Sequence, residues 1–194
     1  MISERKQQER LLRKQRIIDA ALSVFDSCGI DKTTMEQIAA EAGFGKATLY
    51  YYYPSKDHVY KEIMVTGWKS LWLEIEEAIL ADTPPKKKIF DILYQICEIV
   101  KKNNNLYKFL FTAPSHIQET EDLPWKTYQD RLYSVLQSTI EQGCKEGDFI
   151  DLNPEVIMKA IGGLFHELLL GKKDTLTEKE FELMISNLLL LKSN

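Results

Sequence analysis

The side chains that most often carry catalysis or bind metals occur here in few useful combinations. His166 is followed by glutamate, but residue 170 is leucine, so the pair does not complete an H-E-x-x-H zinc motif. Cys28, Cys97 and Cys144 lie far apart and lack metal-ligand spacing. The sequence contains no glycine-rich phosphate loop and no G-x-S-x-G motif. We therefore predict that the protein is not an enzyme and uses neither a metal nor a cofactor.

A different chemistry, hydrogen bonding to another molecule, is indicated by GKATLYYYYPSK at residues 45–56, which holds four consecutive tyrosines. In a strand these rings would alternate between two faces, whereas in a helix each ring turns about 100° from the last. A helix places Leu49 and Tyr53 on one buried face and Tyr51 on the opposite, exposed side. Pro54 disfavours helical geometry at Tyr53, so we expect the helix to end there.

The neighbouring segments that must position these tyrosines also have a helical period. Apolar residues recur at helical spacing from residue 17 to Gly29. Thr33 with Glu36 three positions later forms a capping box for a second helix, which ends at Gly43. The connection AGFG that follows is typical of a helix-turn-helix motif. In such motifs the second helix enters the DNA major groove and presents its N-terminal residues to the bases.

The rest of the chain repeats the helical pattern. We expect helices at residues 56–81, 86–102, 106–111, 124–146, 154–171 and 177–191. No segment shows a strand pattern of useful length, and there is no internal repeat. The predicted fold class is therefore all-α with about nine helices, of which the first three form a small N-terminal helix-turn-helix unit.

Composition and charge distribution indicate where the protein acts and what kind of partner it binds. Its N-terminus has no apolar signal region, and its longest aliphatic run, residues 188–191, is too short to span a membrane. We predict a cytoplasmic protein with no membrane partner. The net charge is −4, but residues 1–56 carry nine Lys/Arg against seven Asp/Glu, so the acidic excess lies in the remainder. This asymmetry suits contact with a polyanion at the N-terminal end, but an excess of two positive charges is also compatible with no such contact, so charge alone does not decide.

The stretch TTMEQIAAEAGFGKATLYYYYPSKDHVY, residues 33–60, resembles the DNA-binding signature of tetracycline-repressor-like (TetR-family) transcription regulators. The matching positions are Thr34, Met35, Ile38, Ala39, Ala42, Gly43, Thr48, Leu49, Tyr50, Tyr52, Tyr53, Ser55 and Lys56. Two positions depart from the signature. Gly45 stands where serine is usual, and Tyr53 stands where phenylalanine is usual, so a buried hydroxyl there needs a partner or must reach the surface.

The resemblance implies a dimeric regulator, most often a repressor, that binds double-stranded operator DNA and is released by a small, mostly hydrophobic effector. It divides the chain into a DNA-binding domain at residues 1–55 and an effector-binding and dimerisation domain at residues 56–194. Phosphate contacts would come from Thr34, Thr48, Tyr50, Tyr52 and Lys56. The bases would meet the start of the third helix, at Gly45, Lys46, Ala47 and Tyr51. The basic arm at residues 1–16 fits a DNA contact and, equally, a solvated helix extension.

The resemblance also directs attention to two features of the C-terminal part. Its last two helices carry broad apolar faces, and Gly162 with Gly163 would allow a close helix approach. The residues predicted at a homodimer interface are Ile157, Ile161, Leu164, Phe165, Leu168, Phe181, Met184, Ile185 and Leu188. The residues predicted at an effector pocket are Trp68, Trp72, Tyr94, Phe109, Trp125, Tyr128 and His166. The alternative for both sets is burial in the core of a single chain.

Other functions stay open on the sequence alone. A member of the same fold could recruit a protein partner or activate transcription without effector-controlled repression. The four tyrosines could also serve as a stacking platform for single-stranded nucleic acid. The helical arrangement argues against that platform, because stacking needs the rings on one accessible surface.

Overall fold

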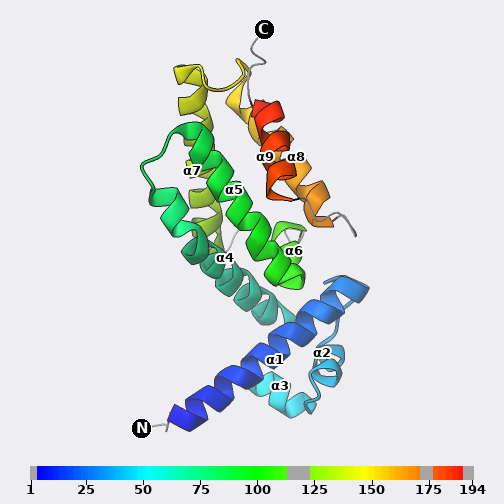
Figure 1. The fold of residues 1–194 in the computed structure, drawn as a ribbon. Coiled ribbons are helices and arrows are strands. Elements are labelled where there is room, and N and C mark those ends of the chain that lie inside the picture. The colour runs from blue at the N-terminus through cyan, green and yellow to red at the C-terminus, as the bar shows by residue number, and fades with distance from the viewer. Residues whose placement is uncertain (1–3, 113–122, 171–176, 190–194) are drawn as a thin grey trace. The chain divides into compact units, whose positions relative to one another are not determined.

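The computed structural model describes residues 4–112, 123–170 and 177–189, and of residues 168–170, 178, 188 and 189 it gives the backbone alone. Within these ranges it contains nine α-helices and no strand, so the predicted all-α class is confirmed (Figure 1). The helices are α1 (Glu4–Cys28), α2 (Met35–Glu41), α3 (Lys46–Tyr52), α4 (Lys56–Leu80), α5 (Pro85–Lys102), α6 (Asn104–Thr112), α7 (Pro124–Glu146), α8 (Pro154–Leu170) and α9 (Glu178–Leu189).

The chain divides into two compact units, and the division falls between Gly67 and Trp68, inside α4. The first unit holds α1 to α3 and the beginning of α4, whereas the boundary predicted from the sequence lies at the first residue of that helix. Lys14 of α1 reaches Glu62 of α4 at 3.1 Å, and Ile63 is fully buried. These contacts explain why the first turns of α4 belong with the helices that precede them.

The first unit is built on α1, against which α2 packs, and α3 packs in turn on α2 (Figure 1). Helix α1 begins at Glu4, so the basic arm is part of a helix and residues 4–13 are exposed along it. Of the two readings of this arm, the helical extension is the one observed. A contact between its exposed basic side chains and DNA stays a prediction.

The start of α2 differs by one residue from the prediction. Thr33 is buried, and its hydroxyl donates to the Gly29 carbonyl at 2.8 Å, which closes the turn after α1. The N-cap is therefore Thr34, and the capping box is completed by Gln37 instead of Glu36. The Gln37 side chain accepts from the Thr34 N–H at 2.8 Å, and the Gln37 N–H donates back to the Thr34 hydroxyl at 3.2 Å.

The second unit consists of the end of α4 with α5 to α9. Helix α7 packs on α5 and α8, and α6 packs on the same two helices. Phe181 of α9 lies among aromatic rings, with ring centroids 5.9 Å from Phe90, 6.1 Å from Tyr94 and 6.4 Å from Phe165. Aromatic rings of three helices thus fix α9 against α5 and α8. In the described part of the chain, no helix combines the length and the apolar character needed to cross a membrane.

Candidate nucleic-acid interface and effector cavity

Helix α3 turns the four tyrosines as the sequence predicts. Leu49 is fully buried and Tyr53 is 3% exposed, whereas Tyr51 is 75% exposed. Tyr50 is exposed and Tyr52 is half-buried, so these two rings flank the outward-facing one. The four rings point in different directions because the residues follow one another around a helix, and they therefore share no common stacking surface.

The turn between α2 and α3 requires a glycine. Gly43 has a φ of +67°, and a Cβ atom there would lie 2.7 Å from the guanidinium of Arg16. The N–H groups of Gly43 and Phe44 donate to the carbonyls of Ala40 and Ala39 at 3.0 and 2.9 Å, which closes the end of α2. The Arg16 guanidinium also lies over the Phe44 ring, 5.2 Å from its centroid. Arg16, counted in the basic arm, thus supports this turn.

The residues predicted to meet the bases lie at the exposed start of α3. Gly45 is the N-cap, with extended backbone geometry and no side-chain cap, and Lys46, Ala47 and Tyr51 follow it on the surface. Lys46 is bound to Glu36 of α2, with its amine 2.9 Å from the carboxylate. The hydrogen bond from Lys46 lowers the pKa of Glu36 below its usual value. An acidic group therefore already binds the predicted base-contacting amine.

The residues predicted to contact phosphate occupy different environments. Thr34 is exposed at the N-terminus of α2, and Thr48 is half-buried on α3. Lys56, at the start of α4, points inward: its amine donates to the carbonyls of Ile30 and Asp31, both at 2.9 Å. No sequence pattern indicates this arrangement, because the two carbonyls are 25 and 26 residues away. Lys56 thus ties the first turn of α4 to the connection between α1 and α2.

The hydroxyl that replaces the usual phenylalanine hydrogen at position 53 is buried and finds no hydrogen-bond partner among the described residues. Burial raises the pKa of Tyr53 well above its ordinary value, and the nearby Glu62 carboxylate raises it further. The amine of Lys14 lies 5.4 Å from the centroid of the same ring. Tyr53 is therefore a neutral core residue, and it neither bonds a described neighbour nor reaches the surface.

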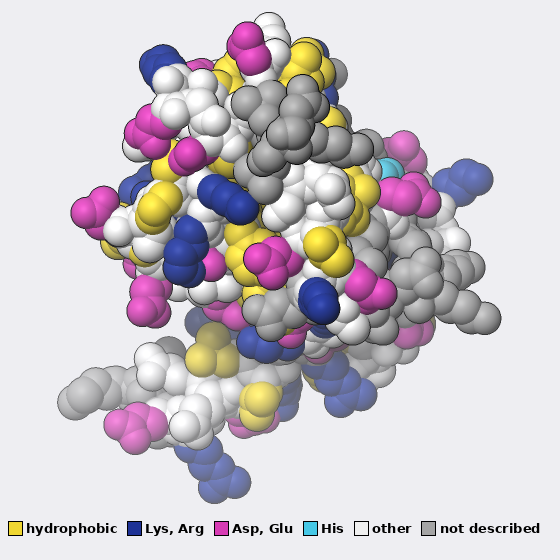
Figure 2. Space-filling view, turned by 45° about the horizontal axis from the view of Figure 1, so that its top comes forward, with side chains coloured by type: hydrophobic (Ala, Val, Ile, Leu, Met, Phe, Trp, Pro, Cys, Tyr) yellow, Lys and Arg dark blue, Asp and Glu magenta, His cyan; other side chains and the backbone are white. Residues whose placement is uncertain are grey.

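Surface charge on the molecule is mixed in sign. On the face drawn in Figure 2, basic and acidic side chains are interspersed, with hydrophobic side chains between them. Several lysines and arginines in helices pair with acids three or four residues away, as Arg13 does with Glu9 and Lys87 with Asp91. Such exposed pairs contribute about 0–1 kcal/mol each. Net charge is therefore a weak guide to the binding surface, and the exposed helix start is a better one.

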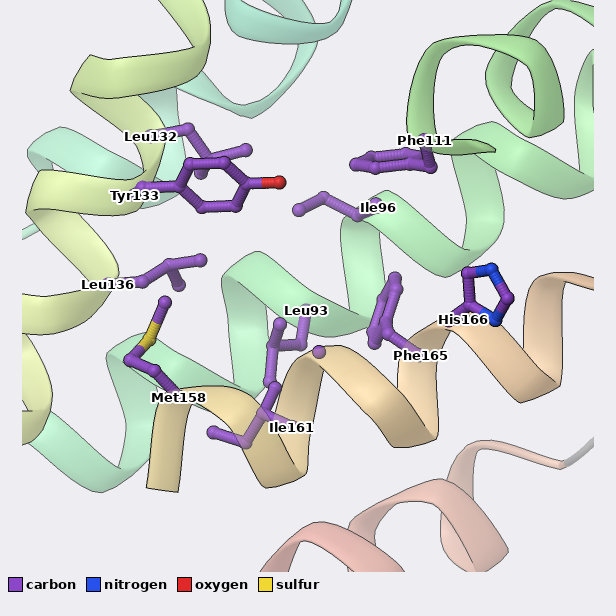
Figure 3. A pocket seen from close by; sticks show the side chains of 11 residues that line it. Leu93, Ile96, Phe111, Leu132, Tyr133, Leu136, Met158, Ile161, Phe165 and His166 are labelled. Atoms are coloured by element: carbon purple, nitrogen blue, oxygen red, sulfur yellow. The ribbon is translucent and has the colours of Figure 1, made fainter. Parts of the chain in front are cut away.

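The second unit contains a cavity of about 170 Å³ between α5, α6, α7 and α8 (Figure 3). Of the seven residues predicted at an effector pocket, only His166 lines this cavity. Trp68 instead packs edge-on against Phe111, with centroids 5.4 Å apart. The Trp72 indole donates to Glu76 at 3.2 Å and lies under the Arg131 guanidinium at 4.3 Å. These tryptophans fill the core.

The other four predicted pocket residues also lie outside the lining. Tyr94 stacks on Phe90 with centroids 5.7 Å apart, and Trp125 is 7% exposed. Phe109 and Tyr128 are half-buried. The residues that do form the walls are largely aliphatic. In the sequence they have the same spacing as ordinary core positions, so no pattern marks them as a binding site.

Most of the residues predicted at the dimer interface are buried inside the single chain. This holds for Ile157, Ile161, Phe165, Phe181 and Ile185, which are 2–8% exposed. Leu164 and Met184 are half-buried, and the side chains of Leu168 and Leu188 lie outside the described residues. Among the described side chains of α8 and α9, the large apolar ones that face outward are Val156, 50% exposed, and Leu183, 54% exposed. The stripe that the periodicity identifies is the one that packs on α5 and α7, because every amphipathic helix first buries its own apolar face.

Comparison with known proteins identifies relatives of this architecture. Residues 17–63 match the family "Bacterial regulatory proteins, tetR family". The uncharacterized HTH-type transcriptional regulator YhgD of Bacillus subtilis (strain 168) is 29% identical over 145 residues, 74% of this chain and 75% of that protein. The biofilm operon icaADBC HTH-type negative transcriptional regulator IcaR of Staphylococcus aureus (strain Newman) is 29% identical over 179 residues, 89% of this chain and 77% of that protein.

Solved structures show the same fold at lower sequence identity. AibR, in complex with isovaleryl coenzyme A and operator DNA, is 17% identical with a TM-score of 0.76, and the match covers 90% of this chain and 97% of AibR. The ketosteroid transcriptional regulator KstR2 of Mycobacterium tuberculosis is 15% identical with a TM-score of 0.79, over 93% of this chain and 96% of KstR2. A helix-turn-helix built from α2 and α3, a family model that matches residues 17–63 and regulators as relatives show that this chain carries the DNA-binding domain of the TetR family of bacterial transcriptional regulators.

Proposed function

We propose that this protein is a homodimeric repressor that binds double-stranded operator DNA through α3 and leaves it when a small effector binds the second unit. The observation that carries the proposal is the exposed start of α3, where Gly45, Lys46, Ala47 and Tyr51 stand on the surface. A helix-turn-helix presents these positions to base edges in the major groove. The relative IcaR is described as a negative regulator, which supports repression over activation.

Contacts to DNA divide into two kinds under this proposal. Lys46, Ala47 and Tyr51 contact the bases, and Tyr51 brings a large, exposed ring. Positioning on the phosphates falls to the hydroxyls around them, which belong to Thr34, Thr48, Tyr50 and Tyr52. Such contacts fix the register of the protein on the duplex without selecting a sequence.

A dimer is needed for operator recognition, because two recognition helices about 34–36 Å apart contact successive major grooves. We place the interface on α8 and α9, on the outward faces that carry Val156 and Leu183. Gly162 and Gly163 are exposed on α8, and a Cβ atom at either would meet nothing within 4 Å. Gly162 also lines the cavity of the second unit, so the proposed interface leaves this glycine open to solvent.

Effector control follows from a shift between two arrangements of the dimer. A ligand that prefers the arrangement with the wrong spacing of recognition helices weakens operator binding by its preference for that form. The neighbour AibR was solved with both isovaleryl coenzyme A and operator DNA, which supports a ligand-controlled regulator as a model. Helix α4 contributes residues to both compact units. A ligand bound in the second unit would therefore act on the DNA-binding helices through α4.

The test is binding of the purified protein to the duplex upstream of its own gene, against a scrambled duplex, across a salt series. We expect tighter binding to the native duplex, with affinity that falls as salt rises. We also expect two subunits, or a multiple of two, for each operator. Equal, weak binding to both duplexes would argue against operator recognition and favour a role in recruiting another protein.

A further inference from the structure

The cavity in the second unit has walls without charge. Among the described residues its lining contains no Asp, Glu, Lys or Arg. Besides the exposed His166 imidazole, three of these residues carry aromatic rings: Phe111 of α6, Tyr133 of α7 and Phe165 of α8. Figure 3 shows these rings around the space, with aliphatic side chains between them. A charged ligand would lose its hydration there without gaining an ionic partner. The walls therefore favour a neutral molecule, and the three rings favour an aromatic one, because rings gain from offset and edge-on contacts.

The hydroxyl of Tyr133 points into this space, and the imidazole of His166 also belongs to the lining (Figure 3). Tyr133 is 43% exposed as a residue, but partial burial of its hydroxyl raises the pKa of Tyr133, so the hydroxyl keeps its proton at neutral pH. The neighbouring Gln129 side chain opposes part of this rise. A tyrosine hydroxyl can donate through its O–H, and the matching group on a ligand is an oxygen that accepts a hydrogen bond.

The volume limits the size of the occupant. A cavity of about 150 Å³ lined by apolar side chains is sufficient for benzene, and this cavity measures about 170 Å³. A single six-membered ring with one small substituent fits such a space, whereas a fused ring system or a long acyl chain does not.

The entrance lies between α7 and α8, because the exposed residues of the lining are Tyr133 on α7 and Gly162 and His166 on α8. Gly162 and His166 line the cavity, and both are exposed to solvent. They are four residues apart and so lie on the same side of the helix. A Cβ atom at Gly162 would meet nothing within 4 Å, so the space beside this glycine is open. Gly163 is equally exposed and equally unobstructed, but it does not line the cavity.

From these features we infer that the cavity binds a neutral, monocyclic aromatic molecule whose single oxygen accepts a hydrogen bond from Tyr133, and that this molecule enters past Gly162. The inference names the ligand class for the effector role and in that respect rests on the proposed function. Binding to the cavity and release of DNA are separate measurements, so each can fail without the other.

Benzyl alcohol is the probe, and three molecules of similar shape serve as comparisons: toluene lacks the oxygen, cyclohexylmethanol lacks the aromatic ring, and benzoate carries a charge. We expect benzyl alcohol to raise the thermal unfolding temperature of the full-length protein most, toluene and cyclohexylmethanol less, and benzoate not at all. A shift with benzoate equal to that with benzyl alcohol would overturn the inference. So would equal shifts with the aromatic and the cyclohexyl alcohol.

Two variants locate the binding site. Tyr133→Phe should lower the affinity for benzyl alcohol by about threefold to tenfold, the value of one neutral hydrogen bond, and should leave toluene binding unchanged. Gly162→Leu should block the entrance and abolish the thermal shift, whereas Gly163→Leu, its matched control on the same helix, should retain it. Oligomeric state is measured for both glycine variants. Unaltered binding in Tyr133→Phe and Gly162→Leu would place the ligand elsewhere and refute the assignment.

The operator assay separates the two proposals. Benzyl alcohol that binds and also releases operator DNA supports both. If it binds in the cavity without changing operator affinity, the ligand class stands and its role as an effector is refuted. If it does not raise the unfolding temperature of a protein that still binds its operator, the ligand class is refuted and operator recognition is untouched.

Discussion

Two explanations of Lys56 make different predictions. The side chain either contacts a DNA phosphate or acts as an internal brace that stabilises the fold through its hydrogen bonds to the backbone. Its amine donates to the Ile30 and Asp31 carbonyls at 2.9 Å each, and the side chain is half-buried. Hydrogen bonds that involve a charged group contribute about 1.5–3 kcal/mol each when buried. Because this pair is partly exposed, we expect Lys56→Met to lower the free energy of unfolding by about 1–3 kcal/mol in total.

Equilibrium unfolding in urea, followed by circular dichroism, measures that decrease. A salt series of operator binding measures the other explanation, because removing one phosphate-binding cation flattens the slope of log K against log salt by about 0.9. If Lys56 is a brace, the slope stays constant and the stability falls. Lys32→Met removes the same charge from an exposed position between α1 and α2 and serves as control. Undiminished stability together with a flatter slope would show that the brace contributes no energy and that Lys56 binds phosphate.

Four further substitutions test the helix-turn-helix. Tyr51→Ala should alter the ranking of operator variants as well as the overall affinity, and a uniform loss across a panel of duplexes would remove Tyr51 from the base-contacting set. Gly43→Ala should destabilise the protein by about 1–3 kcal/mol in urea unfolding, because φ is positive and the new Cβ would clash with Arg16. Gly45→Ala, where φ is −70° and the surroundings are open, replaces an N-cap glycine by the poorer N-cap alanine without backbone strain. It should therefore cost less, about 0.5–1 kcal/mol in the same titration; equal losses would contradict this account. Tyr53→Phe removes a buried hydroxyl without a described partner, so the unfolding midpoint should hold or rise, and a clear fall would reveal a partner.

Sequence patterns are sufficient where local rules act alone. The orientation of α3 follows from helical periodicity and from Pro54, and both Leu49 and Tyr53 are buried as expected. The predicted start of α2 is wrong by one residue because two overlapping pairs fit the capping-box pattern. Only the burial of Thr33 decides between them, and burial depends on how the turn after α1 closes.

The cavity and the interface cannot be predicted in the same way. Whether an aromatic residue fills a core or lines a cavity depends on which helices meet, and Trp68 finds its partner in Phe111, 43 residues along the chain. The apolar stripe on α8 is present as predicted, but amphipathicity does not say whether the chain itself or a second copy covers it. Ile157 and Ile161 are covered by the chain itself.

The ion pair between Lys46 and Glu36 has a consequence for the choice among DNA sequences. A base that accepts strongly, such as guanine through O6 and N7, can take the lysine away from the carboxylate. A base that offers a weaker acceptor leaves the pair intact and gains no contact from the lysine. Glu36 thus acts as an internal competitor, because it sets a threshold that a base must exceed before Lys46 adds to the affinity.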